Sequence, residues 1–254
     1  MITGPIFFTN ARGDGYLYGR QTTGMQFDGR LIHGRLIRRY KRFLADVELD
    51  DGSEVTVHCT NSGSMKSCLE EGAAVYLSPV DNPSRSTRYT WEMIRIGDDW
   101  VGINTARPNQ LAWEWISRGI IPGLEGIREL KREVKWDDSR FDLYGEGKDG
   151  KYFIEVKNVT LREGDLALFP DAVTIRGRKH LQTLIRAVQG GFRAVMLYVV
   201  QRMDVKMFSP ARQIDPAYGE ALDKAVRRGV EVIAVQARVT PSGIDFHRVL
   251  PVAL

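Results

Sequence analysis

The sequence predicts a mixed architecture, in which a small antiparallel β-barrel is followed by an α/β domain. Two observations carry this prediction. Between about Gly29 and Ala106 short alternating strands are separated by turn signals, and no long helix interrupts them. After Pro108 amphipathic helices alternate with apolar strands. With 254 residues the chain is long enough to bury a core in each part.

In the first part, five or so short strands are expected. RLIRRYKRFLADVEL predicts one long bent strand or two short ones, and EVTVHCT alternates as a strand does. Further strands are AVYLSPV, RYTWEMIRIG and WVGINT, with turns at Asp50-Asp51-Gly52 and Gly97-Asp98-Asp99. This pattern indicates an OB-like barrel over residues 29–106. Residues 1–28, rich in Gly, Thr and aromatics without a helical period, predict an N-terminal extension in the form of a hairpin or arm.

In the second part, residues 107–254, the elements are expected in the order helix, three strands, helix, strand, helix, strand. NQLAWEWISRG predicts a helix that ends at Gly119, because glycine commonly terminates helices. The three strands are LKREVKW, SRFDLYG and YFIEVKNV; the remaining elements are IRGRKHLQTLIRAVQGG, FRAVMLYVVQ, AYGEALDKAVRRG and VEVIAVQARV. FRAVMLYVVQ is almost continuously apolar, as a strand covered on both faces should be. The order indicates an α/β domain.

Composition excludes several classes of protein. The longest strongly apolar stretch, Ala194 to Val200, is far too short to span a membrane, and the N-terminal residues lack the basic start of a secretory signal. A cytoplasmic protein without a membrane partner is therefore expected. Cys59 and Cys68 have no second cysteine pair with which to complete a four-ligand zinc site, so we expect them to be small buried side chains.

Positive charge is concentrated after the barrel. Up to Ala106 the chain has 12 Lys and Arg against 13 Asp and Glu, and from Arg107 onward it has 24 against 19. The barrel nevertheless contains one dense basic run, which suits phosphate groups: Arg35, Arg38, Arg39, Lys41 and Arg42. The alternative is a basic strand that only faces solvent.

Three charged side chains in the second part are expected to meet. Glu155 and Lys157 lie two residues apart on a predicted strand and therefore share a face. A tight turn through residues 145–150 would bring Asp142 alongside Glu155. Two carboxylates at one place should not both stay ionised without compensation, and a divalent cation supplies it. The alternative is an exposed ladder of opposite charges on adjacent strands.

The residue types favour Mg²⁺ or Mn²⁺ as the cation. Mg²⁺ prefers oxygen ligands and is commonly held by one or two carboxylates together with water and substrate phosphate. Asp142, Glu155 and the carbonyl oxygen of Val156 are the candidate ligands. Lys157 would orient a water molecule or stabilise developing negative charge.

Further candidates surround this cluster. Arg176, Lys179 and His180 stand at helical spacing near the start of a predicted helix and would contact phosphates, or else form a solvated first turn. Glu114 and Glu133 could supply a further carboxylate or be ordinary surface or ion-pair residues, and Asp171 could reach the site or cap the segment in which it lies.

Several long blocks resemble one known family. The blocks are RYKRFLADVEL, TNSGSM, TWEMI, INTARPNQL, SRFDLYG, FIEVKNVTL, FPDAVTIRGRKHL and MFSPARQIDP. They resemble the sugar fermentation stimulation protein A family over about residues 30–254. The resemblance implies an OB-like domain followed by a PD-(D/E)xK nuclease-like domain, with the motif on Asp142, Glu155 and Lys157. The motif's proline is absent, since Phe141 precedes the aspartate, and SMKSC lacks a glycine that is expected nearer Ser67.

Two functions follow as expectations. The resemblance implies non-specific binding to DNA and a role in regulating genes of sugar metabolism, especially that of maltose. The intact D…ExK set also permits a Mg²⁺-dependent nuclease acting on DNA or RNA. A small-molecule regulator is a weaker option, because no residues mark a sugar pocket. The sequence does not determine the oligomeric state, the preferred nucleic acid, or the purpose of residues 1–28.

Overall fold

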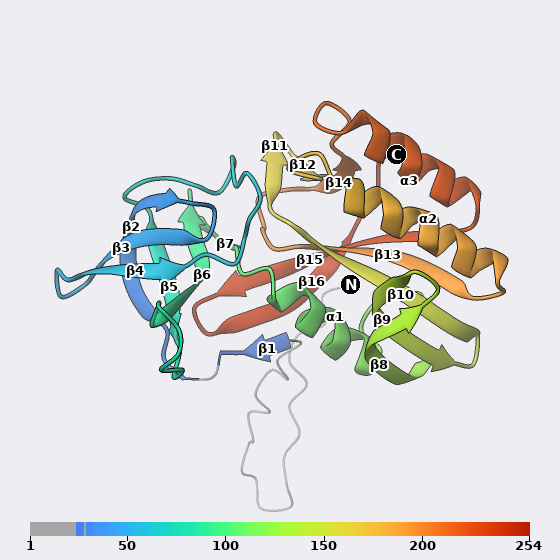
Figure 1. Ribbon diagram of the computed structural model, residues 1–254, viewed down its shortest axis with the longest axis horizontal. Helices are drawn as coiled ribbons and strands as arrows, with labels where there is room; N and C mark the ends of the chain where they lie inside the picture. Colours follow the sequence, from blue (N-terminus) through green and yellow to red (C-terminus); the bar gives the residue numbers. More distant parts are fainter. Residues whose placement is uncertain (1–23, 28) are drawn as a thin grey trace, which may run out of the picture.

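The protein consists of a barrel and an α/β domain that lie side by side. The computed structural model describes residues 24–27 and 29–254. Figure 1 shows the barrel strands on the left and the long sheet with its helices on the right. The predicted order of an OB barrel followed by an α/β domain is confirmed. None of the helices in the part of the chain that the structure describes is long and apolar enough to cross a membrane.

Five strands form the closed barrel. They are β2 (Ile32–Tyr40), β3 (Leu44–Leu49), β4 (Glu54–His58), β5 (Ala74–Pro79) and β6 (Tyr89–Ile96), in the order β4-β3-β2-β5-β6. A parallel bridge between His58 and Thr90 joins β4 to β6 and closes the ring. β7 (Asp99–Gly102) pairs with Met93–Ile96 of β6, on the edge of β6 opposite β5. RLIRRYKRFLADVEL thus forms two strands, and the turn between them contains Lys41 and Arg42 with positive φ angles of 48° and 63°.

Alternation along these strands fills the barrel core. Leu36, Val47 and Val57 are buried from three neighbouring strands, and Trp91 is buried from β6. Both cysteines lie in this core as free thiols, as the sequence predicts. A bulge between Leu36 and Arg38 interrupts the pairing of β2 with β3, so the strand loses strict alternation in the basic run.

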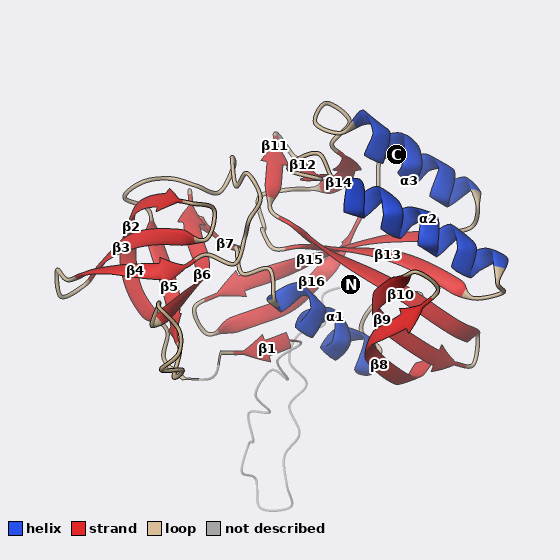
Figure 2. Cartoon of the chain, viewed as in Figure 1, coloured by secondary structure: helices blue, strands red, loops and turns tan. Residues whose placement is uncertain are grey.

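The α/β domain is built on a seven-stranded sheet in the order β1-β16-β15-β13-β10-β9-β8. Its strands are β1 (Gly24–Gln26), β8 (Ile127–Trp136), β9 (Ser139–Gly147), β10 (Gly150–Val159), β13 (Arg193–Val200), β15 (Glu231–Thr240) and β16 (Gly243–Leu250). Helix α1 (Arg107–Ser117) packs on one face, and α2 (Ile175–Gln189) and α3 (Pro216–Arg227) pack on the other (Figure 2). The central strand β13 is therefore covered on both faces, which explains its apolar sequence.

Several strands are not predicted by the sequence pattern. β16 follows the strand that was expected to be the last, and β11 (Leu161–Glu163), β12 (Leu166–Phe169) and β14 (Met207–Pro210) form a separate three-stranded sheet. The small sheet escaped detection because strands of three or four residues show no measurable periodicity. Of the expected arm, residues 1–23 and residue 28 lie outside the described residues, whereas Gly24–Gln26 pair with β16.

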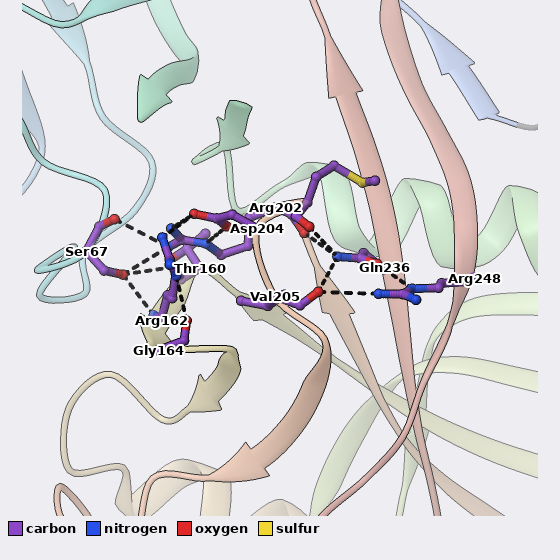
Figure 3. A network of polar contacts seen from close by, with 10 residues as sticks. Ser67, Thr160, Arg162, Gly164, Arg202, Asp204, Val205, Gln236 and Arg248 are labelled. Atoms are coloured by element: carbon purple, nitrogen blue, oxygen red, sulfur yellow. Dashed lines mark hydrogen bonds and ion pairs between the residues drawn. The ribbon is translucent and has the colours of Figure 1, made fainter. Parts of the chain in front are cut away.

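A buried arginine joins the two domains. Arg202, whose side chain is 1% exposed, lies after β13 and forms a two-pronged ion pair with Asp204 at 2.7 and 2.8 Å. Its Nη1 donates to the carbonyl of Thr160 at 2.5 Å and to Ser67 Oγ, in the barrel loop, at 3.0 Å. Figure 3 shows these contacts converging between the two domains. Because the guanidinium is fully desolvated, each of these acceptors offsets the cost of burying its charge.

A second link uses Glu92 on β6. Arg107, at the start of α1, donates to both of its oxygens at 2.7 and 2.9 Å, and Asn104 donates to Oε2 at 2.9 Å. The first turn of the α/β domain is thereby tied to the barrel wall.

Replacing Arg202 by Ala should destabilise the protein by about 2–3 kcal/mol, because the Thr160 carbonyl and Ser67 Oγ lose this donor at the domain seam and Asp204 keeps only its ion pair with Arg162. Urea unfolding followed by circular dichroism measures this. Lys206→Ala is the matched control, because Lys206 pairs with Asp165 at an exposed position and should contribute almost nothing. Equal midpoints for the two variants would contradict the structural role assigned to Arg202.

Candidate functional site

Strand β10 positions the carboxylate cluster. Its ladder with β9 ends at the pair Ile154 and Leu143, one step before Asp142 and Glu155 would face each other. Beyond this pair, the side chain of Asp142 takes the place of a backbone acceptor on β9: its Oδ2 accepts the Val156 N–H at 2.8 Å. The predicted turn therefore does bring Asp142 alongside the Glu155–Lys157 segment.

Glu155 and Lys157 project from one face of β10, as strand alternation predicts. Lys157 Nζ donates to Glu155 Oε1 at 2.5 Å. Ile154 and Val156 point to the opposite face and pack in the core beneath α1. Glu155 is 2% exposed, so its carboxylate depends on the charge and hydrogen bonds that surround it.

His180 on α2 is the second partner of Glu155. Its Nδ1 contacts the same oxygen, Oε1. Arg176, one helical turn earlier, donates from Nε to His180 Nε2 at 3.2 Å. Nε2 therefore faces Arg176, whereas Nδ1 contacts Glu155 and lies 3.4 Å from Lys157 Nζ. His180 is only 7% exposed and therefore does not belong to a solvated first turn, whereas its expected contact with a phosphate stays a prediction.

The pKa values of the two carboxyl groups move in opposite directions. Burial, together with the negative charge of Glu155, raises the pKa of Asp142 above its ordinary value, despite the bonds from Val156 and from Asn109 Nδ2 at 2.9 Å. Burial by itself would raise the pKa of Glu155 too, but the hydrogen bond from His180 and the charge of Lys157 outweigh it and lower that pKa.

The oxygen atoms of this cluster can provide some, but not all, of the ligands that a divalent cation requires. The Lys157 and His180 contacts both fall on Oε1 of Glu155, and neither falls on Oε2. A cation beside Asp142 and Glu155 would also relieve the repulsion that raises the pKa of Asp142. Within residues 24–27 and 29–254, no group of three His, Cys, Asp or Glu side chains forms a complete metal cage. The site thus resembles those that fill the remaining positions with water and substrate oxygens.

The other cationic side chains near the cluster differ in whether they already have a partner in the protein. Arg176 is exposed, and its Nη atoms make no hydrogen bond or ion pair to any described residue. Lys179, in contrast, is 3.2 Å from Asp138 and donates to the carbonyl of that residue. Of the predicted row on α2, Arg176 is therefore the side chain that remains available for an anion.

The basic run of the barrel also separates into distinct roles. Arg38 pairs with Asp46 at 2.9 Å, and Arg35 donates to the carbonyl of Gly72. Arg39 donates from Nη2 to the carbonyls of Arg42, Asn61 and Gly63, so it supports the loop after β4. Lys41 and Arg42 remain exposed in the turn between β2 and β3.

The three predicted accessory carboxylates are placed as follows. Glu114 pairs with Arg118 on α1 at 3.0 Å. Glu133 stands exposed on the edge strand β8 and is 3.8 Å from Arg140. Asp171 lies between the domains and accepts the Ser64 N–H of the barrel loop at 2.8 Å. Of the three, only Asp171 borders the hollow next to the cluster.

This hollow, of about 550 Å³, lies where the barrel meets the α/β domain. The barrel contributes the loop Thr60–Gly63, and β10 contributes Lys157 and Asn158. The segment from Phe169 to Arg176 forms the opposite wall. Lys157 and Arg176 thus face a shared space that is open to a ligand.

Sequence reasoning missed two of these contributors. Asn109, which holds Asp142, is an ordinary polar residue on an amphipathic helix and carries no signal of its own. The loop Thr60–Gly63 is polar like many turns. Only the way in which the domains pack against each other brings these residues to the site.

Comparison with known proteins gives a consistent result. The family described as "SfsA N-terminal OB domain" matches residues 37–103, and that described as "Sugar fermentation stimulation protein RE domain" matches residues 106–243. A sugar fermentation stimulation protein homolog of Geobacter sulfurreducens is 52% identical over 223 residues, which cover 87% of this chain and 96% of the relative. A homolog of Shewanella baltica is 48% identical, with 87% and 97% covered.

A solved structure is also similar. "The structure of Pyrococcus Furiosus SfsA in complex with Ca2+" superposes with a TM-score of 0.84 at 28% identity, covering 92% of this chain and all of that one.

Divalent cation binding at the cluster should weaken as the pH falls. A cation requires ionised carboxylates, and the raised pKa of Asp142 means that this group takes up its proton at a higher pH than an ordinary aspartate. Binding should therefore release protons at a pH where free carboxylates are already ionised. Titration calorimetry with Mn²⁺ in two buffers of different ionisation enthalpy measures the release. Asp142→Asn should abolish this proton release. Unchanged binding of Mn²⁺ in that variant would mean that the cation binds at another site.

Proposed function

The chain belongs to the sugar fermentation stimulation protein family, and from that premise we propose that it binds nucleic acid without sequence preference and hydrolyses phosphodiester bonds at the Asp142–Glu155–Lys157 cluster. One observation carries the proposal. Two carboxylates whose pKa values are shifted in opposite directions lie within the reach of one ammonium group, beside a hollow bordered by an available arginine. The order Asp142, Glu155, Lys157 along the chain is that of the PD-(D/E)xK motif which the family resemblance implies, and this order supports the proposal.

Each residue has a distinct role in this proposal. Arg176 and Lys157 bind the phosphate that faces the hollow. Lys157 further stabilises the negative charge that develops on the phosphate during attack by water. His180 positions Glu155 through its Nδ1–H, and Asn109 does the same for Asp142.

The residues that would hold a divalent cation are Asp142, Glu155 and the carbonyl of Val156. The Ca²⁺ of the Pyrococcus furiosus relative supports such a site here, and the small number of protein ligands favours Mg²⁺ or Mn²⁺ as the working ion. When bound, such an ion neutralises phosphate charge and acidifies a coordinated water molecule.

A second candidate function is nucleic-acid binding without cleavage, coupled to the regulation of sugar metabolism that the names of the relatives suggest. The exposed cations Lys41, Arg42 and Arg176 favour binding by charge alone. The barrel and sheet present no helix arranged to read base edges, at least over residues 24–27 and 29–254. In this second candidate function, regulation acts through binding that is not specific for sequence.

Lys157→Ala should separate cleavage from binding. Cleavage of DNA in Mn²⁺ should fall by on the order of a hundredfold or more, because a charge-stabilising group is lost. Affinity measured in chelator should fall far less, by about tenfold at most, since Lys157 is one phosphate contact among several. Lys151→Ala is the matched control, because Lys151 lies exposed on the same strand.

Two results would contradict the proposal. If the purified protein cuts no substrate in Mg²⁺ or Mn²⁺, binding without cleavage becomes the function. If cleavage survives Lys157→Ala at the full rate, the activity arises at another site or from a contaminant.

A further inference from the structure

A second hollow continues the one beside the cluster. Its volume is about 620 Å³, and it lies against the barrel wall between the loop that joins β5 to β6 and the start of α1. Thr60 borders both hollows. It is joined to Thr105 by two hydrogen bonds of 3.0 Å, and this pair forms the ridge between them. We refer to the two hollows and the ridge together as the seam groove.

Cations stand at both ends of the seam groove. Lys157 and Arg176 border the first hollow, and Arg85 borders the second. Arg85 reaches only the hydroxyls of Thr87 and Thr90, at 3.4 and 3.3 Å. No carboxylate among the described residues pairs with it. A partly buried guanidinium with only hydroxyl partners is suited to a phosphate, to which it can donate two parallel hydrogen bonds.

The carboxylates that border the groove are already engaged. Asp171 accepts the Ser64 N–H. Glu92 is held by Arg107 and Asn104. The remaining polar lining consists mostly of hydroxyl, amide and backbone groups, contributed by Thr60, Asn61, Ser62, Thr105, Ser78, Ser84, Ser86, Thr87 and Thr90. Such a lining can hydrogen-bond sugars and phosphates without repelling them.

Each hollow is of the size that accommodates one small unit of a nucleic acid. Their volumes fall in the range of small-ligand pockets, on the order of 300–1,000 Å³. Each is thus large enough for a nucleotide or two. The walls are protein on both sides, because Ser64 and Asp171 join the barrel loop to the α/β domain across the first hollow.

The barrel contributes the features that OB-folds use for oligonucleotides. Binding in this fold relies on the loops after the first and the fourth strand, which here are the turns at Lys41–Phe43 and at residues 80–88. The second of these loops contains Arg85. The first presents Phe43, 51% exposed, next to the loop that borders the groove, because Cys59 N donates to the carbonyl of Phe43. An exposed aromatic ring is a surface on which a base can stack.

We propose that the seam groove is a track for single-stranded nucleic acid. Lys157 and Arg176 hold the phosphate at the cluster, and Arg85 holds a phosphate farther along the same strand. Phe43 stacks on a base at the mouth of the track. The inference rests on the proposed function for the identity of the cleaved phosphate, but the binding track is tested at Arg85 and Phe43, two barrel residues to which the proposed cleavage assigns no role.

Binding tests the track directly. The protein is titrated in chelator with a fluorescent oligothymidylate long enough to span the groove, over a series of salt concentrations. Arg85→Gln should weaken affinity about tenfold, as expected for a lost charge-assisted bond, and lower the slope of log affinity against log salt by about 0.7, the value for one phosphate of a single strand. Phe43→Ala should weaken affinity by about tenfold without changing that slope.

The matched control is Arg95→Gln. Arg95 lies exposed on β6 of the same barrel and contacts Gly97 and the Trp100 ring, outside the seam groove. Its loss should leave affinity within twofold. Melting curves confirm that all variants are folded. The track is overturned if Arg85→Gln binds like the wild type, or if a blunt duplex of equal length competes as well as the single strand.

Cleavage distinguishes this inference from the proposed function. Single strand, blunt duplex and duplex with a single-stranded tail are compared in Mn²⁺. The single strand and the tail should be cut, and the blunt duplex should resist. Preferred cleavage of the blunt duplex would overturn the track while leaving the proposed function intact. Binding through Arg85 without any cleavage would support the track and reject the phosphodiesterase.

Discussion

The structure around the candidate site depends on the need to keep a buried carboxylate charged. Glu155 lies on β10, a strand with cores on both faces, where an uncompensated charge would cost several kcal/mol. Lys157 supplies compensation from the same strand, and His180 supplies it from α2. The docking of α2 is therefore tied to the charge of Glu155. The same helix turn presents Arg176 to the hollow, so the position of this cation depends on the docking of α2 against the buried acid.

The seam between the domains depends on a comparable constraint. Arg202 must satisfy its guanidinium away from water, and it does so by binding Asp204, Thr160 and Ser67 at once. The barrel loop therefore lies against the end of β10. Gly63 in that loop is required by the close approach, because a Cβ atom there would collide with the Asp171 carboxylate. The walls of the seam groove are thus set by packing and not by the loop alone.

The sequence could predict whatever depends on local periodicity. Alternation placed Glu155 and Lys157 on one face of β10 and Ile154 on the other, and helical spacing placed Arg176 and His180 on one side of α2. Spacing could not show whether that side faces solvent or the protein. His180 lies on the protein side of the helix, where its Nδ1 contacts the buried carboxylate of Glu155.

Other features could not be predicted because they arise from irregularity or from domain packing. After the bulge in β2, Arg39 donates to the carbonyls of Asn61 and Gly63. The sequence shows a run of five cations, but among the described residues only Lys41 and Arg42 are exposed without a carboxylate or carbonyl partner. Asn109 reaches Asp142 from a helix that begins after the barrel. No pattern within either segment indicates that contact.

The opposite pKa directions of the two carboxyl groups assign them different roles. Glu155, whose pKa is lowered, stays ionised across the neutral range and serves as the fixed negative centre that orients Lys157. Asp142, whose pKa is raised by burial and by that same negative charge, is the group whose ionisation responds to a nearby positive charge. Pairs of acids whose environments separate their pKa values are typical of catalytic sites, because one member holds the geometry while the other changes state. A proton exchanged at this site is therefore expected at Asp142, whose pKa is raised mainly by burial and by the charge of Glu155, while Lys157, the Val156 N–H and Asn109 act in the opposite direction.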